Sequence, residues 1–150
     1  MSSLQEILTT AQNRARELKL PYEGAVTPRE AFELMQRAPG THLVDVRSKA
    51  ELDWVGRIPG AVEIEWVSYP GMTRNPLFLD HLRRQVDSEG LVLFICRSGQ
   101  RSHFAAAVAT EAGFADCYNV LEGFEGEKDT SAHRNTVGGW RVAGLPWIQG

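Results

Sequence analysis

The sequence is poor in cysteine, in long hydrophobic runs and in excess charge of either sign. With only 2 cysteines in 150 residues, it cannot form a disulfide scaffold or a four-thiolate zinc site. Its longest apolar runs, such as 91–96, are far shorter than the ~20 residues that a membrane-spanning helix requires. The 16 Lys and Arg residues against 19 Asp and Glu give a net charge of −3, so no overall basic field attracts nucleic acid.

The N-terminus also lacks the basic leader and apolar core of a secretory signal. The composition, 43% hydrophobic and 23% charged, is typical of a soluble globular domain, and the length fits a single domain. His42, His81 and His133 show no metal-ligand spacing. We therefore expect a cytoplasmic protein with reduced cysteines that needs neither a metal nor a cofactor and binds neither membranes nor nucleic acid.

Helices are predicted at several places along the chain. Residues 3–19 carry apolar side chains at helical spacing. Capping boxes predict two more helix starts, at 27–30 and 48–51. Asn75-Pro76 is expected to cap a helix that runs to about residue 86, and the alanine-rich stretch 102–112 predicts another.

Strands are predicted between these helices. The apolar segments 42–46 and 91–95 are expected to be buried strands, with a brief strand at 62–66 and the last strand at 117–120. Strands that alternate with helices favour a parallel or mostly parallel α/β sheet. Ligands of such sheets bind outside the carboxyl ends of the strands, and Cys96 falls at that edge.

One loop combines a thiol with positive charge. It separates the strand 91–95 from the helix 102–112 and consists of Cys96, Arg97, Ser98, Gly99, Gln100 and Arg101. A free thiol has a pKa near 8.5, and a helix N-terminus and neighbouring arginines favour the thiolate. Gly99 can adopt a positive φ, which lets the N–H groups of the loop converge on an anion. A buried structural cysteine is the alternative, but this combination of residues favours a reactive one.

The segment Cys-Arg-Ser-Gly-Gln-Arg-Ser at 96–102 resembles the active-site loop of the rhodanese family of sulfurtransferases. Similar motifs follow the family's order from about Val26 to Trp147: Leu-Val-Asp-Val-Arg at 43–47, Gly-Arg-Ile-Pro-Gly-Ala at 56–61, Asn-Val-Leu-Glu-Gly at 119–123 and Gly-Leu-Pro at 144–146. The resemblance implies a three-layer rhodanese-like α/β fold over residues 26–150, with a central, mostly parallel five-stranded sheet flanked by helices. Residues 1–25 would be a helical extension that packs on the sheet, covers an edge or mediates dimerisation.

The resemblance also implies a mechanism. Cys96 would be the catalytic nucleophile and would carry sulfur as a persulfide. The substrate would be bound by Arg97, Ser98, Gly99, Gln100, Arg101 and Ser102. The two arginines favour thiosulfate or a similar anionic donor, and a thiol or cyanide would accept the sulfur. Asp45 and Arg47 are expected to hold the loop, with a structural ion pair as the alternative.

Two other functions remain open. The chain could relay sulfur from the persulfide of a donor protein to an acceptor protein. It could also be a phosphatase or arsenate reductase of the same fold, although those enzymes use Cys-x5-Arg, and the spacing from Cys96 to Arg101 is one residue shorter. The shorter ring suits a sulfur atom better than a phosphoryl group.

Several residues depart from the family pattern or lack an assigned role. Arg57 replaces a histidine, and a role at the surface or at a pocket rim is expected. Phe124 replaces a second glycine, and 125–138 is longer than usual, which is consistent with a lid, a partner surface or a solvated excursion. His103 is a candidate general base that a preformed thiolate would not need. Cys117 is expected to be buried and inert, with a role as a resolving thiol as the alternative.

Overall fold

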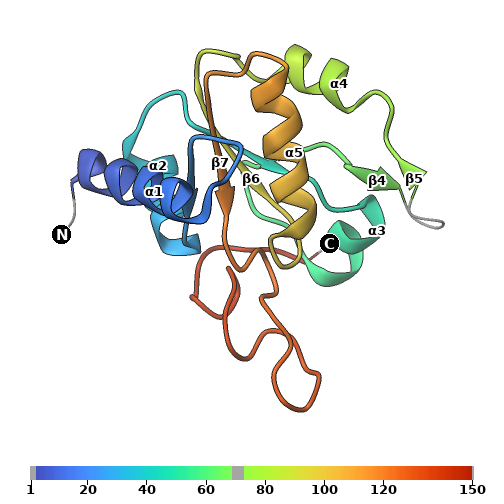
Figure 1. The fold of residues 1–150 in the computed structure, drawn as a ribbon. Helices are drawn as coiled ribbons and strands as arrows, with labels where there is room; N and C mark the ends of the chain where they lie inside the picture. Colours follow the sequence, from blue (N-terminus) through green and yellow to red (C-terminus); the bar gives the residue numbers. More distant parts are fainter. Residues whose placement is uncertain (1–2, 69–72, 150) are drawn as a thin grey trace.

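The fold is built on one parallel sheet. The structure is a computed structural model that describes residues 3–68 and 73–149, drawn in Figure 1. The five-stranded sheet has the order β1-β7-β6-β2-β3, and every neighbouring pair is parallel. Its strands are β1 (Gly24–Val26), β2 (His42–Asp45), β3 (Val62–Glu63), β6 (Leu91–Ile95) and β7 (Asp116–Val120). The predicted α/β class with a five-stranded, mostly parallel sheet is confirmed.

Helices cover both faces of the sheet and complete three layers. They are α1 (Leu4–Leu18), α2 (Pro28–Arg37), α3 (Lys49–Val55), α4 (Phe78–Gln85) and α5 (Gln100–Glu111). Alternate residues of β6 enter two different cores. Val92 and Phe94 share a cluster with residues of α4 and α5, whereas Leu93 and Ile95 share one with α1 and α2. A strand buried on both faces is apolar at every position, which explains the unbroken run 91–95.

Local capping fixes most of the helix starts. Ser3, Thr27 and Ser48 each form a capping box with a glutamate three residues later, so the predicted starts at Thr27 and Ser48 are confirmed. The prediction for α4 is wrong by two residues, because Leu77 is its N-terminal cap and no side chain caps it. Asn75 Oδ1 instead accepts a hydrogen bond from Leu77 N–H at 3.0 Å, which forms a turn before the helix.

Three strands were missing from the sequence prediction. The edge strand β1 has only three residues, too few to show a pattern. The loop expected from Ser68 lies partly outside the described residues, and its described ends pair as the antiparallel strands β4 (Val67–Ser68) and β5 (Thr73–Arg74). The strand predicted at 62–66 is shorter than expected, since β3 ends at Glu63.

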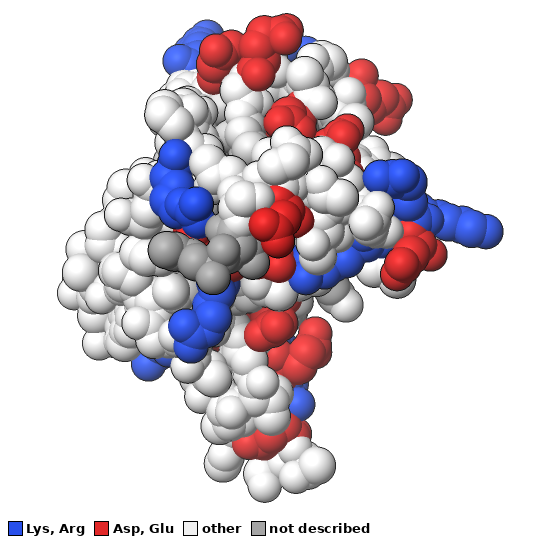
Figure 2. Space-filling view, turned by 90° about the vertical axis from the view of Figure 1, so that its left-hand side faces the viewer, with Lys and Arg blue, Asp and Glu red and all other residues white. Residues whose placement is uncertain are grey.

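The N-terminal helix packs on the fold, which is one of the three arrangements considered for it. Ile7 and Ala11 of α1 share a hydrophobic cluster with Val26 of β1 and Leu34 of α2. Arg14 adds an ion pair of 2.6 Å with Glu30 of α2. On the side of the molecule shown in Figure 2, Lys and Arg side chains are interspersed with Asp and Glu.

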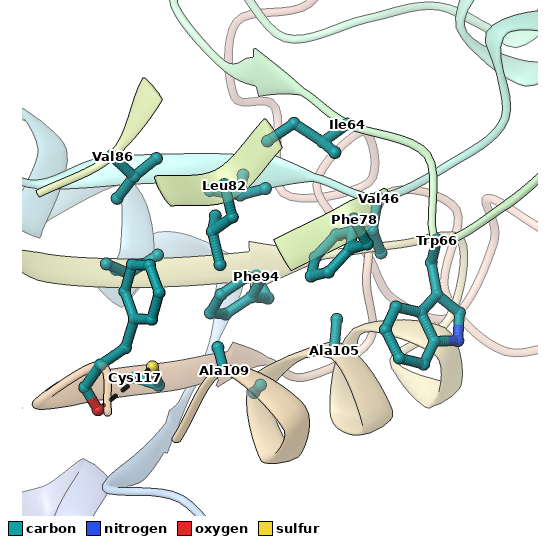
Figure 3. Packing of buried hydrophobic residues seen from close by; sticks show 14 of the residues in the cluster. Val46, Ile64, Trp66, Phe78, Leu82, Val86, Phe94, Ala105, Ala109 and Cys117 are labelled. Atoms are coloured by element: carbon teal, nitrogen blue, oxygen red, sulfur yellow. Dashed lines mark hydrogen bonds between the residues drawn. The ribbon is translucent and has the colours of Figure 1, made fainter. Parts of the chain in front are cut away.

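The core that contains residues of α4 and α5 holds α5 close to the sheet (Figure 3). Ala105 and Ala109 face β6 and leave room for Phe94 and Phe78. Phe78 packs edge-to-face against Trp66, with ring centroids 5.1 Å apart. Because α5 is anchored by small residues at its centre, its N-terminus is held in a fixed place at the end of β6.

Candidate active site

Cys96 lies where β6 ends and α5 begins, at the carboxyl edge of the sheet. Helix α5 starts at Gln100, and Gly99 is its N-terminal cap with φ 105°, a left-handed conformation that suits glycine. The irregular loop therefore spans only 96–99. The sequence predicted a six-residue loop, and the difference arises because Gln100 and Arg101 already belong to the first turn of the helix.

The Cys96 sulfur is enclosed by hydrogen-bonding groups. The residue is 1% exposed. Gly99 N–H donates to Sγ at 3.1 Å, and Ser102 Oγ lies 3.3 Å from it. The first N–H groups of a helix have no partner within the helix, and the helix dipole adds positive potential at that end. The site is therefore suited to a negatively charged sulfur.

The hydroxyl proton of Ser102 has two competing acceptors. Ser102 Oγ lies 2.6 Å from Asn119 Oδ1, and Asn119 Nδ2 donates to the Gly99 carbonyl at 3.1 Å. A carbonyl can only accept, so the amide nitrogen must face Gly99 and the amide oxygen must face Ser102. With a neutral Cys96 thiol, Ser102 donates to Asn119 and can accept from the thiol. With a thiolate, the hydroxyl can turn and donate to sulfur.

This arrangement predicts the effect of Ser102→Ala. The thiolate loses one donor while Gly99 N–H remains, so we expect sulfur transfer to fall about tenfold. Iodoacetamide alkylation of Cys96 at pH 7 should slow as well, because the thiolate is the reactive form and loses a stabilising donor. The measurement is made in a Cys117→Ser background so that one thiol is followed. An unchanged alkylation rate would show that Ser102 does not stabilise the thiolate.

Arg101 is held by Glu51 of α3. Its Nη1 and Nη2 donate to the two carboxylate oxygens at 2.6 and 2.7 Å. Burial alone would raise the pKa of Glu51. The hydrogen bonds and charge of Arg101, together with hydrogen bonds from Ser48, lower that pKa to about 2. Burial would lower the pKa of Arg101, but Glu51 raises it, and the charge of nearby Cys96 adds to that effect. Arg101 is thus a fixed, largely neutralised cation beside the sulfur.

The Glu51 pKa gives a pH-dependent stability prediction. A carboxylate whose folded pKa lies near 2 instead of 4.5 stabilises the fold above about pH 4.5 and loses that contribution as the pH falls toward 2. We expect Glu51→Gln to lower the free energy of unfolding by ~2–3 kcal/mol at pH 7 and by much less near pH 2. Urea denaturation at both pH values measures this. The exposed control Glu127→Gln should change neither, and an equal loss at both pH values would contradict the account.

The other loop side chains do not converge on the sulfur. Arg97 and Gln100 are exposed, and Ser98 is partly exposed. Among the residues that the structure describes, Arg97 forms no ion pair, unlike Arg101. Arg97 and Arg101 line a pocket of about 300 Å³ together with residues of α3, among them Trp54 and Val55. The two arginines therefore differ, and only Arg97 has an uncommitted charge.

Asp45 and Arg47 form a fully buried ion pair at the end of β2. Arg47 Nη2 lies 2.7 Å from Asp45 Oδ2, and both side chains are 0% exposed. The Arg47 guanidinium also stacks on the Phe124 ring, 4.0 Å from its centroid, and Phe124 N–H donates to the Cys96 carbonyl at 2.8 Å. The pair thus reaches the loop through Phe124, and the charge of Asp45 also acts on Arg101, which supports the predicted positioning role.

The segment that follows β7 is bonded to the backbone of the catalytic loop. Three successive backbone N–H groups make these bonds. The first is Phe124 N–H, and the N–H groups of Glu125 and Gly126 donate to the Arg97 carbonyl at 2.9 and 3.2 Å. The rest of 125–138, orange to red in Figure 1, extends away from the sheet. Asp129 organises it by accepting from Ser131 N–H and His133 N–H. Within the described residues, it supplies none of the lining of the pocket beside Arg97, so it supports the loop from one side rather than covering the pocket.

His103 and Cys117 face away from this chemistry. Burial raises the pKa of Tyr22 to about 12, although a hydrogen bond with Asn119 acts in the opposite direction. The phenol is therefore protonated and can donate to His103 Nδ1, 2.7 Å away. Burial also raises the pKa of Cys117 to about 11. Cys117 pairs with Val92, four residues before Cys96 along β6, which corresponds to a separation of ~13 Å. A disulfide between the two thiols is excluded at that distance.

Other charged groups lie outside the loop. Arg57 pairs with Asp53 and Glu63 and lines a separate pocket of about 380 Å³, so it is at a pocket rim.

No three His, Cys, Asp or Glu residues within 3–68 and 73–149 are grouped so that they could hold a metal ion. Over the same ranges, none of the helices combines the length and apolar character needed to cross a bilayer.

Sequence reasoning missed three partners of the loop. Glu51 was recognised only as part of a motif, and its ion pair joins residues 50 positions apart. Asn119 and Tyr22 are distant in sequence from the groups they contact. The signal for Glu51 was the unpaired charge of Arg101, which needed an acidic partner. Asn119 was likewise recognised only as part of the motif at 119–123, and no signal marked Tyr22.

Comparison with known proteins places this geometry in a family. The family model of the Rhodanese-like domain matches residues 27–129. The crystal structure of Rv0390 from M. tuberculosis is similar, with a TM-score of 0.79 and 45% identity over 86% of this chain and 99% of that one.

Two curated relatives are also similar. The uncharacterized protein RC0915 of Rickettsia conorii is 33% identical, over 79% of this chain and 91% of its own length. The thiosulfate sulfurtransferase GlpE of Pseudomonas putida is 31% identical, over 67% of this chain and 80% of its own length. The residues matched by the family model, 27–129, include the strands β2, β3, β6 and β7, the Cys96 loop and the helices α2 to α5.

Proposed function

Because this chain belongs to the family of rhodanese-like domain proteins, we propose that it is a sulfurtransferase that carries sulfane sulfur as a persulfide on Cys96. The observation that carries the proposal is the Cys96 sulfur at the N-terminus of α5, 3.1 Å from Gly99 N–H. The relative from Pseudomonas putida, named a thiosulfate sulfurtransferase, supports thiosulfate as the donor.

The proposed reaction has two steps. The Cys96 thiolate attacks the outer sulfur of thiosulfate, a sulfur–sulfur bond forms, and the bond to the sulfonate sulfur breaks with its electron pair leaving on sulfite. Cyanide or a thiolate then attacks the outer sulfur of the persulfide and returns the electron pair of that bond to Cys96. Gly99 N–H and the Ser102 hydroxyl stabilise the negative charge on the Cys96 sulfur, which is a thiolate before the first step and after the second.

The proposal predicts that the protein transfers sulfur and does not hydrolyse phosphate esters. Both Nη atoms of Arg101 are bound to Glu51, so the end-on edge of its guanidinium and much of its charge are already committed and less is left to hold a phosphoryl group. The test compares thiocyanate formation from thiosulfate and cyanide with hydrolysis of p-nitrophenyl phosphate by the same preparation. We expect turnover in the first assay alone. Phosphate hydrolysis without thiocyanate formation would overturn the proposal.

A further inference from the structure

A chain of hydrogen bonds leads from the Cys96 sulfur toward the surface of the molecule. The Ser102 hydroxyl and the Asn119 amide form its first links. Tyr22 follows, a residue that is 6% exposed and lies in the same core cluster as Cys96. Tyr22 Oη is 2.7 Å from His103 Nδ1, and the two rings meet edge to face. The chain therefore connects a partly exposed imidazole with a buried thiol.

The direction of the outer hydrogen bonds follows from the groups that can only accept. One N–H of Asn119 Nδ2 donates to the Gly99 carbonyl. The hydrogen bond between Asn119 and Tyr22 lowers the pKa of the phenol, and a bond that favours the phenolate must be donated to its oxygen. The second N–H of the amide therefore points to Tyr22. The phenol proton is left for His103 Nδ1, which accepts it.

These contacts fix one orientation of the Asn119 amide. In the opposite orientation, its oxygen would face the Gly99 carbonyl and the Tyr22 oxygen. Tyr22 could not relieve this contact, because its proton is already donated to His103. Buried acceptors that face each other without a donor are costly. The amide oxygen is therefore kept toward Ser102, 2.6 Å from Oγ.

The orientation of the amide decides how Ser102 treats the sulfur. The hydroxyl has one proton, and both Asn119 Oδ1 and Cys96 Sγ can accept it. A thiolate gains when the proton turns to sulfur, whereas an uncharged sulfur does not need it. An amide oxygen that is held in place keeps the proton and thus favours the uncharged forms of Cys96. In the proposed reaction these are the thiol and the inner sulfur of the persulfide.

We propose that Tyr22 and His103 are positioning residues that restrain the reactivity of Cys96. They act by holding the oxygen of Asn119 toward Ser102, and not on the sulfur directly. The inference rests on the proposed function where it concerns the persulfide, because a more stable thiolate leaves more readily when an acceptor removes the outer sulfur. The part that concerns the free thiol does not require sulfur transfer.

Alkylation of Cys96 by iodoacetamide at pH 7, in a Cys117→Ser background, tests the inference. We expect Tyr22→Phe and His103→Leu each to raise the rate about fivefold, because the amide is released and Ser102 can donate to the thiolate. His103→Asn should return the rate to that of the wild type, since its amide oxygen can accept the Tyr22 proton. Rates that are unchanged or lower in both Tyr22→Phe and His103→Leu would overturn the inference. Equal rates in His103→Asn and His103→Leu would overturn the role of His103.

Two further variants distinguish positioning from a general loosening of the fold. In Ser102→Ala the disputed proton is absent, so the addition of Tyr22→Phe should change the rate less than about twofold. Tyr118→Phe is the matched control, because Tyr118 is also a buried phenol with a hydrogen-bond partner, Gln12 at 3.1 Å, but lies in the other core cluster. It should leave the alkylation rate unchanged. A fivefold increase in either experiment would contradict the inference.

Discharge of the Cys96 persulfide by cyanide, followed by intact mass, separates the inference from the proposed function. We expect the persulfide to be lost about fivefold faster in His103→Leu than in the wild type. If no persulfide forms but alkylation depends on Tyr22 and His103 as expected, the proposed function fails and the inference about the thiol stands. If the persulfide forms and cyanide removes it, but both rates are the same in the wild type and the two variants, the function stands and the inference fails.

Discussion

Replacement of Cys96 with serine should lower thiosulfate-dependent thiocyanate formation by ~10³-fold or more. A serine hydroxyl is not ionised at neutral pH and cannot form a persulfide, so the loss reflects the chemistry of the sulfur and not a change in packing. The near-equal size of the two side chains keeps the contact with Gly99 N–H possible. Steady-state assays with saturating thiosulfate and cyanide measure the effect.

Cys117→Ser is the control for this substitution. Cys117 is buried in the core between α5 and the sheet, and burial raises the pKa of its thiol to about 11, so it remains a protonated, inert group at neutral pH. We expect the variant to keep its activity per folded molecule, although a polar hydroxyl in this core lowers stability. Residual turnover in Cys96→Ser that disappears only when Cys117 is also replaced would show that the wrong thiol was assigned.

Gly123→Ala should disable the site through the backbone. Gly123 has φ 63°, and a Cβ there would lie 2.5 Å from the Cys96 carbonyl oxygen and 2.6 Å from the Arg97 carbonyl carbon. These atoms belong to the catalytic loop, so relief of the clash must displace it. We expect a loss of ~2–4 kcal/mol in the free energy of unfolding and a fall of roughly 100-fold in turnover. Chemical denaturation and steady-state kinetics check the two parts.

Gly60→Ala is the control that separates the effect of backbone strain from that of the steric clash at Gly123. Gly60 also has a positive φ, 82°, but no atom lies within 4 Å of the position of its Cβ. The variant therefore carries the cost of the left-handed conformation alone, ~1 kcal/mol, and should keep its turnover. If Gly60→Ala and Gly123→Ala lost activity to the same extent, the close approach to the Cys96 loop would not explain the effect.

The elements with strong local signals could be predicted from the sequence. The run 91–95 is apolar throughout because both faces of β6 are buried, and capping boxes at Thr27 and Ser48 define two helix starts. The position of Cys96 at a strand end followed from the same patterns. These features depend on neighbours in sequence, so periodicity and capping were sufficient to find them.

What could not be predicted depends on long-range contacts. The strand β1 exists because Gly24–Val26 pairs with β7 almost a hundred residues away and not because of its own composition. Arg101 is neutralised by Glu51, so the Cys96 loop carries one free cation, Arg97, where the sequence suggested two. The support of the loop by Phe124 and Glu125 consists of backbone hydrogen bonds, which leave no mark on side-chain identity.

The central claim is that Cys96 carries the transferred sulfur, and intact-mass analysis tests it most directly. The protein is incubated with thiosulfate, separated from the excess donor, and measured before and after addition of cyanide. We predict a gain of the mass of one sulfur atom, mapped to the peptide that contains Cys96, which cyanide removes. An unmodified protein, or sulfur found on Cys117 instead, would contradict the account.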